Sequence, residues 1–216
     1  VKQAAVQRFK PEALIDNEKD AHKLLRALQE QARPLCAWWL RQNATDLRAL
    51  RLNRTLAWLA LVGYPGADAE RTTDLRGPAP EKLKRYQERF DQGHHADLML
   101  ELEASLAGAM FWLDGVRMVW QCLEALRAEP AMTELEVTFA LLLQRLPHLP
   151  EFRFHDGTPF ADDITRDWIA LHVTRHLQTP ETCTKVVDAN AAPWEAALLS
   201  VASRLRKDGL KAAVGE

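Results

Sequence analysis

The chain has 216 residues, of which 47% are hydrophobic and 27% are charged, and its formal net charge is −2. This length and hydrophobic content exclude a disordered chain and predict one large domain with a substantial core. The near-neutral charge argues against general affinity for nucleic acid or an acidic membrane surface. Three scattered cysteines give no disulfide framework and favour a reducing, cytoplasmic location.

Nothing in the sequence predicts membrane insertion. Apolar runs such as 56–62 and 139–143 are far shorter than the ~20 residues that span a bilayer. The first residues lack the apolar core of a signal peptide. Because the chain starts with Val1 rather than Met, we expect it to be a fragment of a longer protein.

The first predicted helix follows an arm or linker at residues 1–15. Asp16 or Asn17 supplies a capping oxygen for its start. Pro34 lacks a backbone N–H and predicts a kink or a new helix start within this region. Trp38 and Trp39 in this region are not required by any single apolar stripe of a helix. We therefore expect a self-association face made of Leu24, Leu25, Leu28, Trp38 and Trp39.

A second helix is expected to begin at Thr45 or Asp46 and to run to Gly63. Its apolar positions become nearly all-round toward the C-terminal end, which predicts a central place in the bundle. One of its arginines, Arg54, lies among leucines and is a candidate to pair with a buried carboxylate. Three arginines, Arg48, Arg51 and Arg54, form a strip along this helix. Salt bridges or solvation explain the strip better than phosphate binding does.

Four more helices are expected in the middle of the chain. Residues 66–80 are rich in glycine, proline, threonine and aspartate and predict a surface loop. A helix is predicted from Pro80 to a break at Gly93, followed by a short helix with leucines at fourfold spacing. Apolar stripes predict two further helices, over 113–126 and 130–146.

Residues 151–160 differ from the rest, because they show the alternation of an extended segment and carry a turn signal at Asp156-Gly157. Asp162 or Asp163 then caps a helix that carries Trp168. We expect Phe160 to anchor the turn onto that helix.

The C-terminal part is predicted to hold a polar loop over 179–192, a final helix from Pro193, and a linker over 209–216. No internal repeat of fixed period is present, which argues against a regular solenoid. The predicted fold is therefore all-α, an irregular bundle of roughly eight to ten helices within residues 16–208, with one short extended segment near 151–160.

The sequence carries few residues in patterns typical of catalysis. His172 and His176 are spaced i, i+4 and share a helix face, but zinc needs further ligands and no HExxH motif is present. No nucleophile elbow or phosphate-binding loop occurs. We expect no enzymatic activity, cofactor or metal, and we expect His94 and His95 to be solvated turn residues.

The seven tryptophans point partly to the core and partly to an interface. Trp58 and Trp168 fall on apolar helical stripes, as does Trp120, and are expected in the core. Trp112 is not placed by periodicity, and neither is the Trp38–Trp39 pair. A surface tryptophan among these three would support a partner site.

An ordered set of short motifs resembles the VasJ-type TssA family of type VI secretion. The segment 154–162, with Thr165 and Trp168, resembles its signature. Segments 52–58, 63–65, 73–78, 111–114 and 146–149, with Glu103, match family motifs in the same order. The signature residues, for which turn and cap chemistry favours a structural role, are Arg54, Trp58, Trp112, Asp114, Phe154, Asp156, Gly157, Thr158, Pro159, Phe160, Asp162 and Trp168.

The resemblance implies an organising role in type VI secretion, with baseplate, tube and sheath proteins as partners. It also implies a middle domain without the N-terminal ImpA-type and C-terminal ring-forming domains. We expect self-association, since symmetric dimers are the commonest oligomers. Two alternatives stay open: a metal-dependent hydrolase that uses His172 and His176 with Asp163 or Asp167, and a helical adaptor unrelated to secretion.

Overall fold

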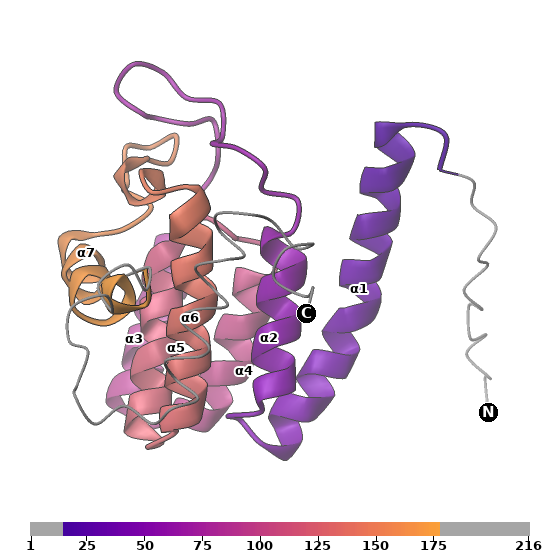
Figure 1. Ribbon diagram of the computed structural model, residues 1–216. Helices are drawn as coiled ribbons and strands as arrows, with labels where there is room; N and C mark the ends of the chain where they lie inside the picture. The colour runs from indigo at the N-terminus through magenta and orange to yellow at the C-terminus, as the bar shows by residue number, and fades with distance from the viewer. Residues whose placement is uncertain (1–14, 178–216) are drawn as a thin grey trace, which may run out of the picture. The chain divides into compact units, whose positions relative to one another are not determined.

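A computed structural model describes residues 15–177 of the chain. Within this range seven α-helices pack together, and three short helical turns accompany them (Figure 1). The described part is therefore all-α, as predicted. The elements are α1 (Glu18–Gln42), α2 (Leu47–Trp58), α3 (Pro80–Asp91), α4 (His95–Leu106), α5 (Leu113–Ala125), α6 (Glu129–Arg145), η1 (Leu149–Glu151), α7 (Asp163–Trp168), η2 (Ile169–Val173) and η3 (Thr174–His176).

Three helix starts have the side-chain caps that the sequence predicts. Asn17 caps α1, Asp46 caps α2 and Asp162 caps α7, and each side chain accepts a hydrogen bond from a backbone N–H of the first turn. Such a bond satisfies a donor that the helix itself leaves without a partner.

The new helix start predicted as one alternative at Pro34 is wrong, because α1 continues through this residue. Contacts on both sides of the proline hold the helix together. On its N-terminal side, the Gln29 side chain donates to the carbonyl of Leu56 in α2 over 2.8 Å. On its C-terminal side, Cys36 and Leu40 are buried. Tertiary packing thus offsets the backbone hydrogen bond that proline removes.

The predicted extension of the second helix to Gly63 is also wrong, since α2 ends at Trp58. Leu59 is 57% exposed and Val62 is 96% exposed, and of residues 59–62 only the half-buried Leu61 packs against the core. The buried residues of α2 run from Ala49 in its first turn to Trp58 at its end.

The main core lies among α2, α4, α5 and α6, which pack as neighbours, and α3 covers α4. Removing these apolar side chains from water supplies the main driving force for folding. A smaller cluster of Cys36, Leu40 and Ala49 joins α1 to α2. The largest fully buried apolar side chains of the main core include Leu50, Leu98, Leu102, Leu113, Leu123, Leu135 and Phe139.

The extended segment near 151–160 is present, but it forms only isolated β-bridges and no strand in the described range. Arg153 pairs with Thr72 in parallel and with Pro159 in antiparallel fashion. The loop after α2 is thereby tied to the signature segment. The seven α-helices within residues 15–177 are slightly fewer than the roughly eight to ten expected, partly because Pro34 does not divide α1. The predictions for residues 1–14, for 179–192, for the helix from Pro193 and for 209–216 lie outside the described residues.

None of the helices in residues 15–177 combines the length and the apolar character that crossing a membrane requires.

Candidate functional site

A tight turn forms the centre of the signature segment. The Asp156 carboxylate accepts a hydrogen bond from the Thr158 backbone N–H over 3.0 Å, and the Thr158 carbonyl accepts from Phe154 over 2.7 Å. Gly157 has a φ of +83°, which glycine adopts without steric cost. Hydrogen bonds from Thr158 lower the pKa of the exposed Asp156 below its ordinary value. The turn is thus closed by its own residues.

Phe160 anchors this turn, but to a different element from the one predicted. Its ring is fully buried, with its centroid 4.6 Å from that of Phe154 and 5.3 Å from that of Phe111. Its carbonyl accepts the Leu113 N–H over 2.9 Å. The anchor therefore holds the segment on the start of α5, and Trp168 instead stacks on Phe139 of α6.

A polar clamp joins the first turns of α5 and α7. The Asp114 carboxylate accepts hydrogen bonds from the Asp162 N–H over 2.8 Å and from the Thr165 hydroxyl over 2.7 Å. Arg117 donates to the same hydroxyl over 2.8 Å. Burial raises the pKa of Asp114 above its ordinary value, although these hydrogen bonds oppose the shift.

A buried ion pair joins α2 to α4. Arg54 and Glu103 are 4% and 1% exposed, and a guanidinium nitrogen of Arg54 lies 2.5 Å from Glu103 Oε2. The amide of Asn53 donates to the same oxygen over 2.9 Å. The pairing of Arg54 with a buried carboxylate is therefore confirmed. Trp58, one turn farther along α2, packs its ring 5.8 Å from Phe139 in the core.

Trp112 belongs to the core rather than to a surface. It is 3% exposed and stacks on Tyr86 with a centroid distance of 6.1 Å. A Cβ atom at Gly115 would clash with its ring, so this glycine permits the close approach. Trp112 is thus excluded as the surface tryptophan of a partner site.

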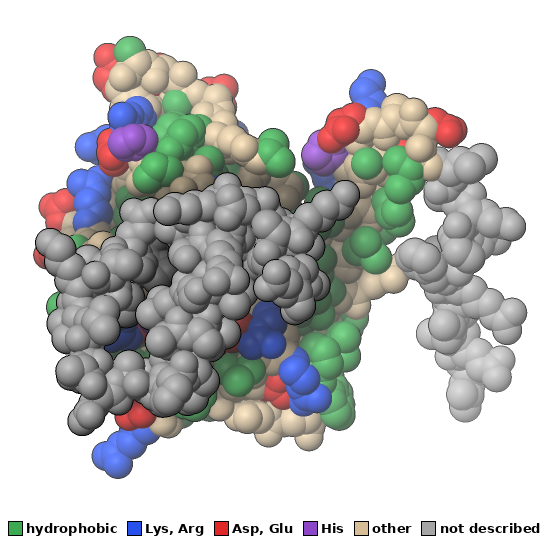
Figure 2. Space-filling view, in the orientation of Figure 1, with side chains coloured by type: hydrophobic (Ala, Val, Ile, Leu, Met, Phe, Trp, Pro, Cys, Tyr) green, Lys and Arg blue, Asp and Glu red, His purple; other side chains and the backbone are tan. Residues whose placement is uncertain are grey.

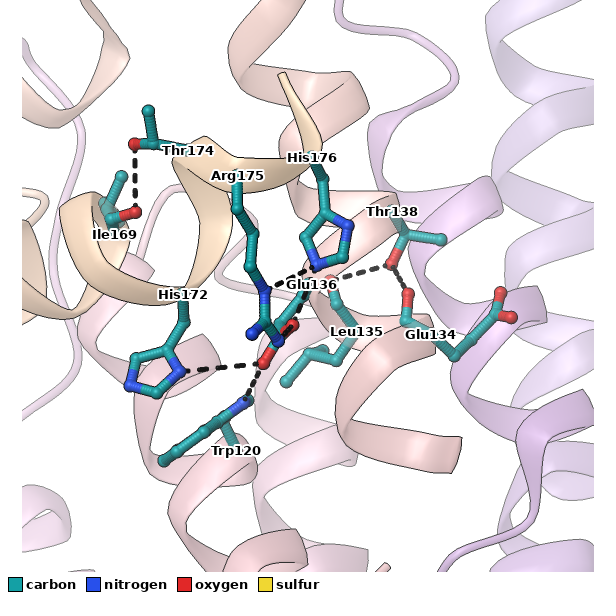
Figure 3. A network of polar contacts seen from close by, with 10 residues as sticks. All are labelled: Trp120, Glu134, Leu135, Glu136, Thr138, Ile169, His172, Thr174, Arg175 and His176. Carbon is teal, nitrogen blue, oxygen red and sulfur yellow. Dashed lines mark hydrogen bonds and ion pairs between the residues drawn. The ribbon is translucent and has the colours of Figure 1, made fainter. Parts of the chain in front are cut away.

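His172 and His176 converge on a buried carboxylate that the sequence did not reveal (Figure 3). Glu136 of α6 is 1% exposed and accepts hydrogen bonds from Trp120 Nε1 and His176 Nε2, each over 2.8 Å. Arg175 donates to it as well, and His172 Nδ1 lies 3.9 Å away. Burial alone would raise the pKa of Glu136, but the hydrogen bonds from these donors outweigh it and lower that pKa.

This geometry gives the metal hypothesis no further ligand. Asp163 is exposed and pairs with Arg166, and Asp167 is also exposed. Within residues 15–177 no group of at least three histidine, cysteine, aspartate or glutamate side chains is placed to hold a metal ion. The expectation for His95 was wrong, because it is half-buried and packs edge-on against Phe90 at 4.8 Å.

The arginine strip of α2 forms salt bridges, which the sequence predicted as one of two alternatives to phosphate binding. Arg48 pairs with Asp46 over 2.7 Å, and Arg51 pairs with Glu134 of α6 over 2.5 Å. With Arg54 buried, the strip offers no face of free positive charge for a polyanion.

The predicted self-association residues of α1 differ in how far they are exposed. Leu24, Leu25 and Trp39 are half-buried. Trp39 packs on the small α1–α2 cluster, with the Arg48 guanidinium 4.8 Å from its ring centre. Leu28 and Trp38 point outward and are 39% and 52% exposed. Figure 2 shows hydrophobic side chains gathered along this helix.

Sequence reasoning missed two residues. Leu35 is 44% exposed and lies between Leu28 and Trp38 on α1, and its spacing of seven from Leu28 was an available signal. Glu136 lies between Leu135 and Phe139, which belong to an apolar stripe. A charge in such a place requires partners, and this was an available signal.

A family model described as "Type VI secretion, EvfE, EvfF, ImpA, BimE, VC_A0119, VasJ" matches residues 22–215. No curated protein matches the chain. Because the family match covers most of its length, the chain belongs to this VasJ family of type VI secretion components.

Proposed function

We propose that this VasJ-family protein is a helical scaffold that associates with a second copy of itself through α1. The observation that carries the proposal is an apolar stripe on the outer face of that helix. We call Leu28, Leu35 and Trp38 the α1 stripe; the three side chains are 39%, 44% and 52% exposed. Exposed aromatic and leucine side chains in a row are typical of protein interfaces.

The α1 stripe is separate from the face that holds α1 on the bundle. Successive residues of an α-helix are rotated by about 100°, so the stripe and Leu24 fall within about 80° of arc. Cys36 and Leu40, which are buried against α2, lie about 130° farther around the helix. Helix α1 therefore has two apolar faces, and only one of them is used in the described fold.

The spacing of the stripe suits an antiparallel pair of α1 helices. Leu24, Leu28, Leu35 and Trp38 follow heptad spacing, with Gln31 at the remaining seam position. A two-fold axis at Gln31 places Leu24 opposite Trp38, and Leu28 opposite Pro34, one residue from Leu35. Such a closed two-fold arrangement is the commonest form of soluble oligomer.

The charges at the helix ends support the same arrangement. Glu18 and Asp20 lie in the first turn of α1 and Arg41 lies in its last turn. The two-fold axis at Gln31 brings Asp20 of one copy beside Arg41 of the other. Opposite charges then meet at both ends of the apolar seam, whereas a parallel pair would bring like charges together.

The test is the molar mass of the full chain, measured by light scattering and sedimentation equilibrium. We expect a dimer for the unaltered chain and a monomer for Leu35→Ser combined with Trp38→Ser. The matched control is Leu141→Ser on α6, where the replaced leucine is 55% exposed; it should remain a dimer. A monomeric unaltered chain at high micromolar concentration would refute the proposal.

The direction of pairing has its own test. Asp20→Arg should weaken the dimer, and adding Arg41→Asp should restore it, because the double exchange recreates the two opposite-charge contacts. If the double variant were weaker than either single variant, an antiparallel pair would be excluded.

The wider role follows from the resemblance to TssA. In this proposal residues 16–208 are the helical middle domain of a longer cytoplasmic protein, and the dimer presents it to baseplate, tube and sheath components. Crosslinking and mass spectrometry in cells with an intact type VI system would identify those contacts. Crosslinks from α1 should join two copies of this protein.

A further inference from the structure

One polar residue, Gln31, lies inside the arc of the α1 stripe. It is exposed, and it follows Leu28 by three residues and precedes Leu35 by four. Residues at these spacings share one face of a helix, so the Gln31 amide stands between the two leucines rather than beside the stripe. Any helix that covers the stripe therefore also takes this amide out of water.

The surroundings of Gln31 on the outer face of α1 are apolar. Leu28 and Leu35 lie on either side of it along the helix, and Ala27 and Pro34 flank it on one edge. A primary amide has two N–H donors and an accepting oxygen. Its burial without hydrogen-bond partners is unfavourable. A helix that packs on the stripe must therefore supply both a donor and an acceptor at this point.

A second copy of the chain meets this requirement in one register. The two-fold axis of the proposed dimer passes through Gln31 and places this residue opposite itself. The amides of the two copies then satisfy each other, since an N–H group of each donates to the oxygen of the other. A shift of three residues brings Gln31 opposite Leu28 of the other copy, and a shift of four brings it opposite Leu35. Neither leucine offers a hydrogen bond, and an apolar helix of another protein has the same defect.

We propose that Gln31 fixes the register of the α1 pair and restricts the α1 stripe to a second copy of this chain. The two amides bond to each other at the centre of the seam, and leucines close the seam on both sides. A single polar residue in an apolar helix seam specifies register in this way, at a cost in affinity. The inference rests on the proposed dimer, and it is separate from the end charges that set the direction of pairing.

Replacing the amide by charges tests whether Gln31 meets itself. Gln31→Glu and Gln31→Lys, each alone, should be monomeric by sedimentation equilibrium at concentrations where the unaltered chain is a dimer, because like charges then meet on the axis. An equimolar mixture of the two variants should return to the mass of a dimer. The control is Arg26→Glu, at an exposed position on the opposite side of α1, which should remain a dimer.

Gln31→Leu tests the selection of partners. Its homodimer should have a Kd at least roughly tenfold lower than that of the unaltered chain, because two more leucines are buried. In an equimolar mixture with a tagged unaltered chain, mixed dimers should fall below the share of about half that random pairing gives, since each leaves one amide unpaired. Native mass spectrometry counts the three species.

The outcomes separate the role of Gln31 from the dimer itself. A monomeric unaltered chain would refute the dimer. With a dimeric unaltered chain, the role of Gln31 would be overturned by a dimeric Gln31→Glu variant, by a charge mixture that stays monomeric, or by random pairing with Gln31→Leu. The dimer would then stand without it.

Discussion

At the scale of single residues, the buried charges of this protein act as joints between helices. The Arg54–Glu103 pair connects α2 with α4, and Glu136 connects α6 with the segment after α7. Both carboxylates are 1% exposed. Buried charges are tolerated when several donors satisfy them. When one partner is removed, the remaining charge stays buried without compensation for its lost hydration.

Glu136→Gln should destabilise the fold at neutral pH by about 2–4 kcal/mol, because charge-assisted hydrogen bonds become neutral ones. The folded-state pKa of Glu136 lies below its ordinary value, so this stabilisation is present above pH 4.5 or so and is lost as the pH falls through the folded pKa. Urea unfolding at several pH values checks this, with exposed Glu124→Gln as control. A difference from the control that does not shrink as the pH falls below 4.5 would contradict it.

Arg54→Met should cost about 3–5 kcal/mol of unfolding free energy, since Glu103 would remain buried without its cation. Arg54→Met with Glu103→Leu should recover most of that loss, because no charge is then buried. A double-mutant cycle by chemical denaturation measures the coupling. Additive effects of the two substitutions would show that the pair contributes no mutual stabilisation.

At the scale of elements, the sequence predicted what nearest neighbours in the chain control. Asn17, Asp46 and Asp162 cap helices through contacts within three residues, and the stripe of α5 lies within one helix. The two errors, at Pro34 and at the end of α2, depend on packing between elements distant in sequence. Local propensity does not contain that information.

The candidate site likewise combines local contacts, which the sequence predicts, with contacts between distant residues, which it does not. The turn at Asp156-Gly157 could be predicted, because its hydrogen bonds are local. Trp120, Glu136 and His176 could not be joined by sequence reasoning, because 16 and 40 residues separate the partners of their hydrogen bonds. A helical histidine pair has the same spacing whether it binds a metal or a buried acid.

Gly115→Ala in the first turn of α5 should destabilise the protein by about 1–3 kcal/mol, since the new methyl group must displace the Trp112 ring. The gain in helix propensity, about 1 kcal/mol, opposes this loss. Gly108→Ala is the matched control, because its added Cβ would meet only ordinary contact distances. Thermal unfolding compares the two; a higher Tm for Gly115→Ala would contradict the close packing.

At the scale of the whole molecule, the described fold leaves α1 as an outer layer beside α2 (Figure 1). One face of this layer is used for the described fold, and the α1 stripe is the face proposed to bind a second copy. In the proposed dimer, stability and association are linked, because only folded chains can pair.

The Tm of the unaltered chain should therefore rise with protein concentration, as mass action requires for a dimer. The Leu35→Ser, Trp38→Ser variant should show a Tm that does not change with concentration. Differential scanning calorimetry over a hundredfold range of concentration distinguishes the two. A concentration-independent Tm for both would exclude a dimer coupled to folding.

The thin attachment of α1 has a consequence for its motion. This helix has 25 residues, yet only Cys36 and Leu40 of them are buried. A segment with so few fully buried side chains opens at a lower free energy than the rest of the molecule unfolds. Its amide protons should exchange with deuterium before those of α5, and pairing of two copies should slow that exchange. The helix proposed to join the copies would then also be the one that assembly makes rigid.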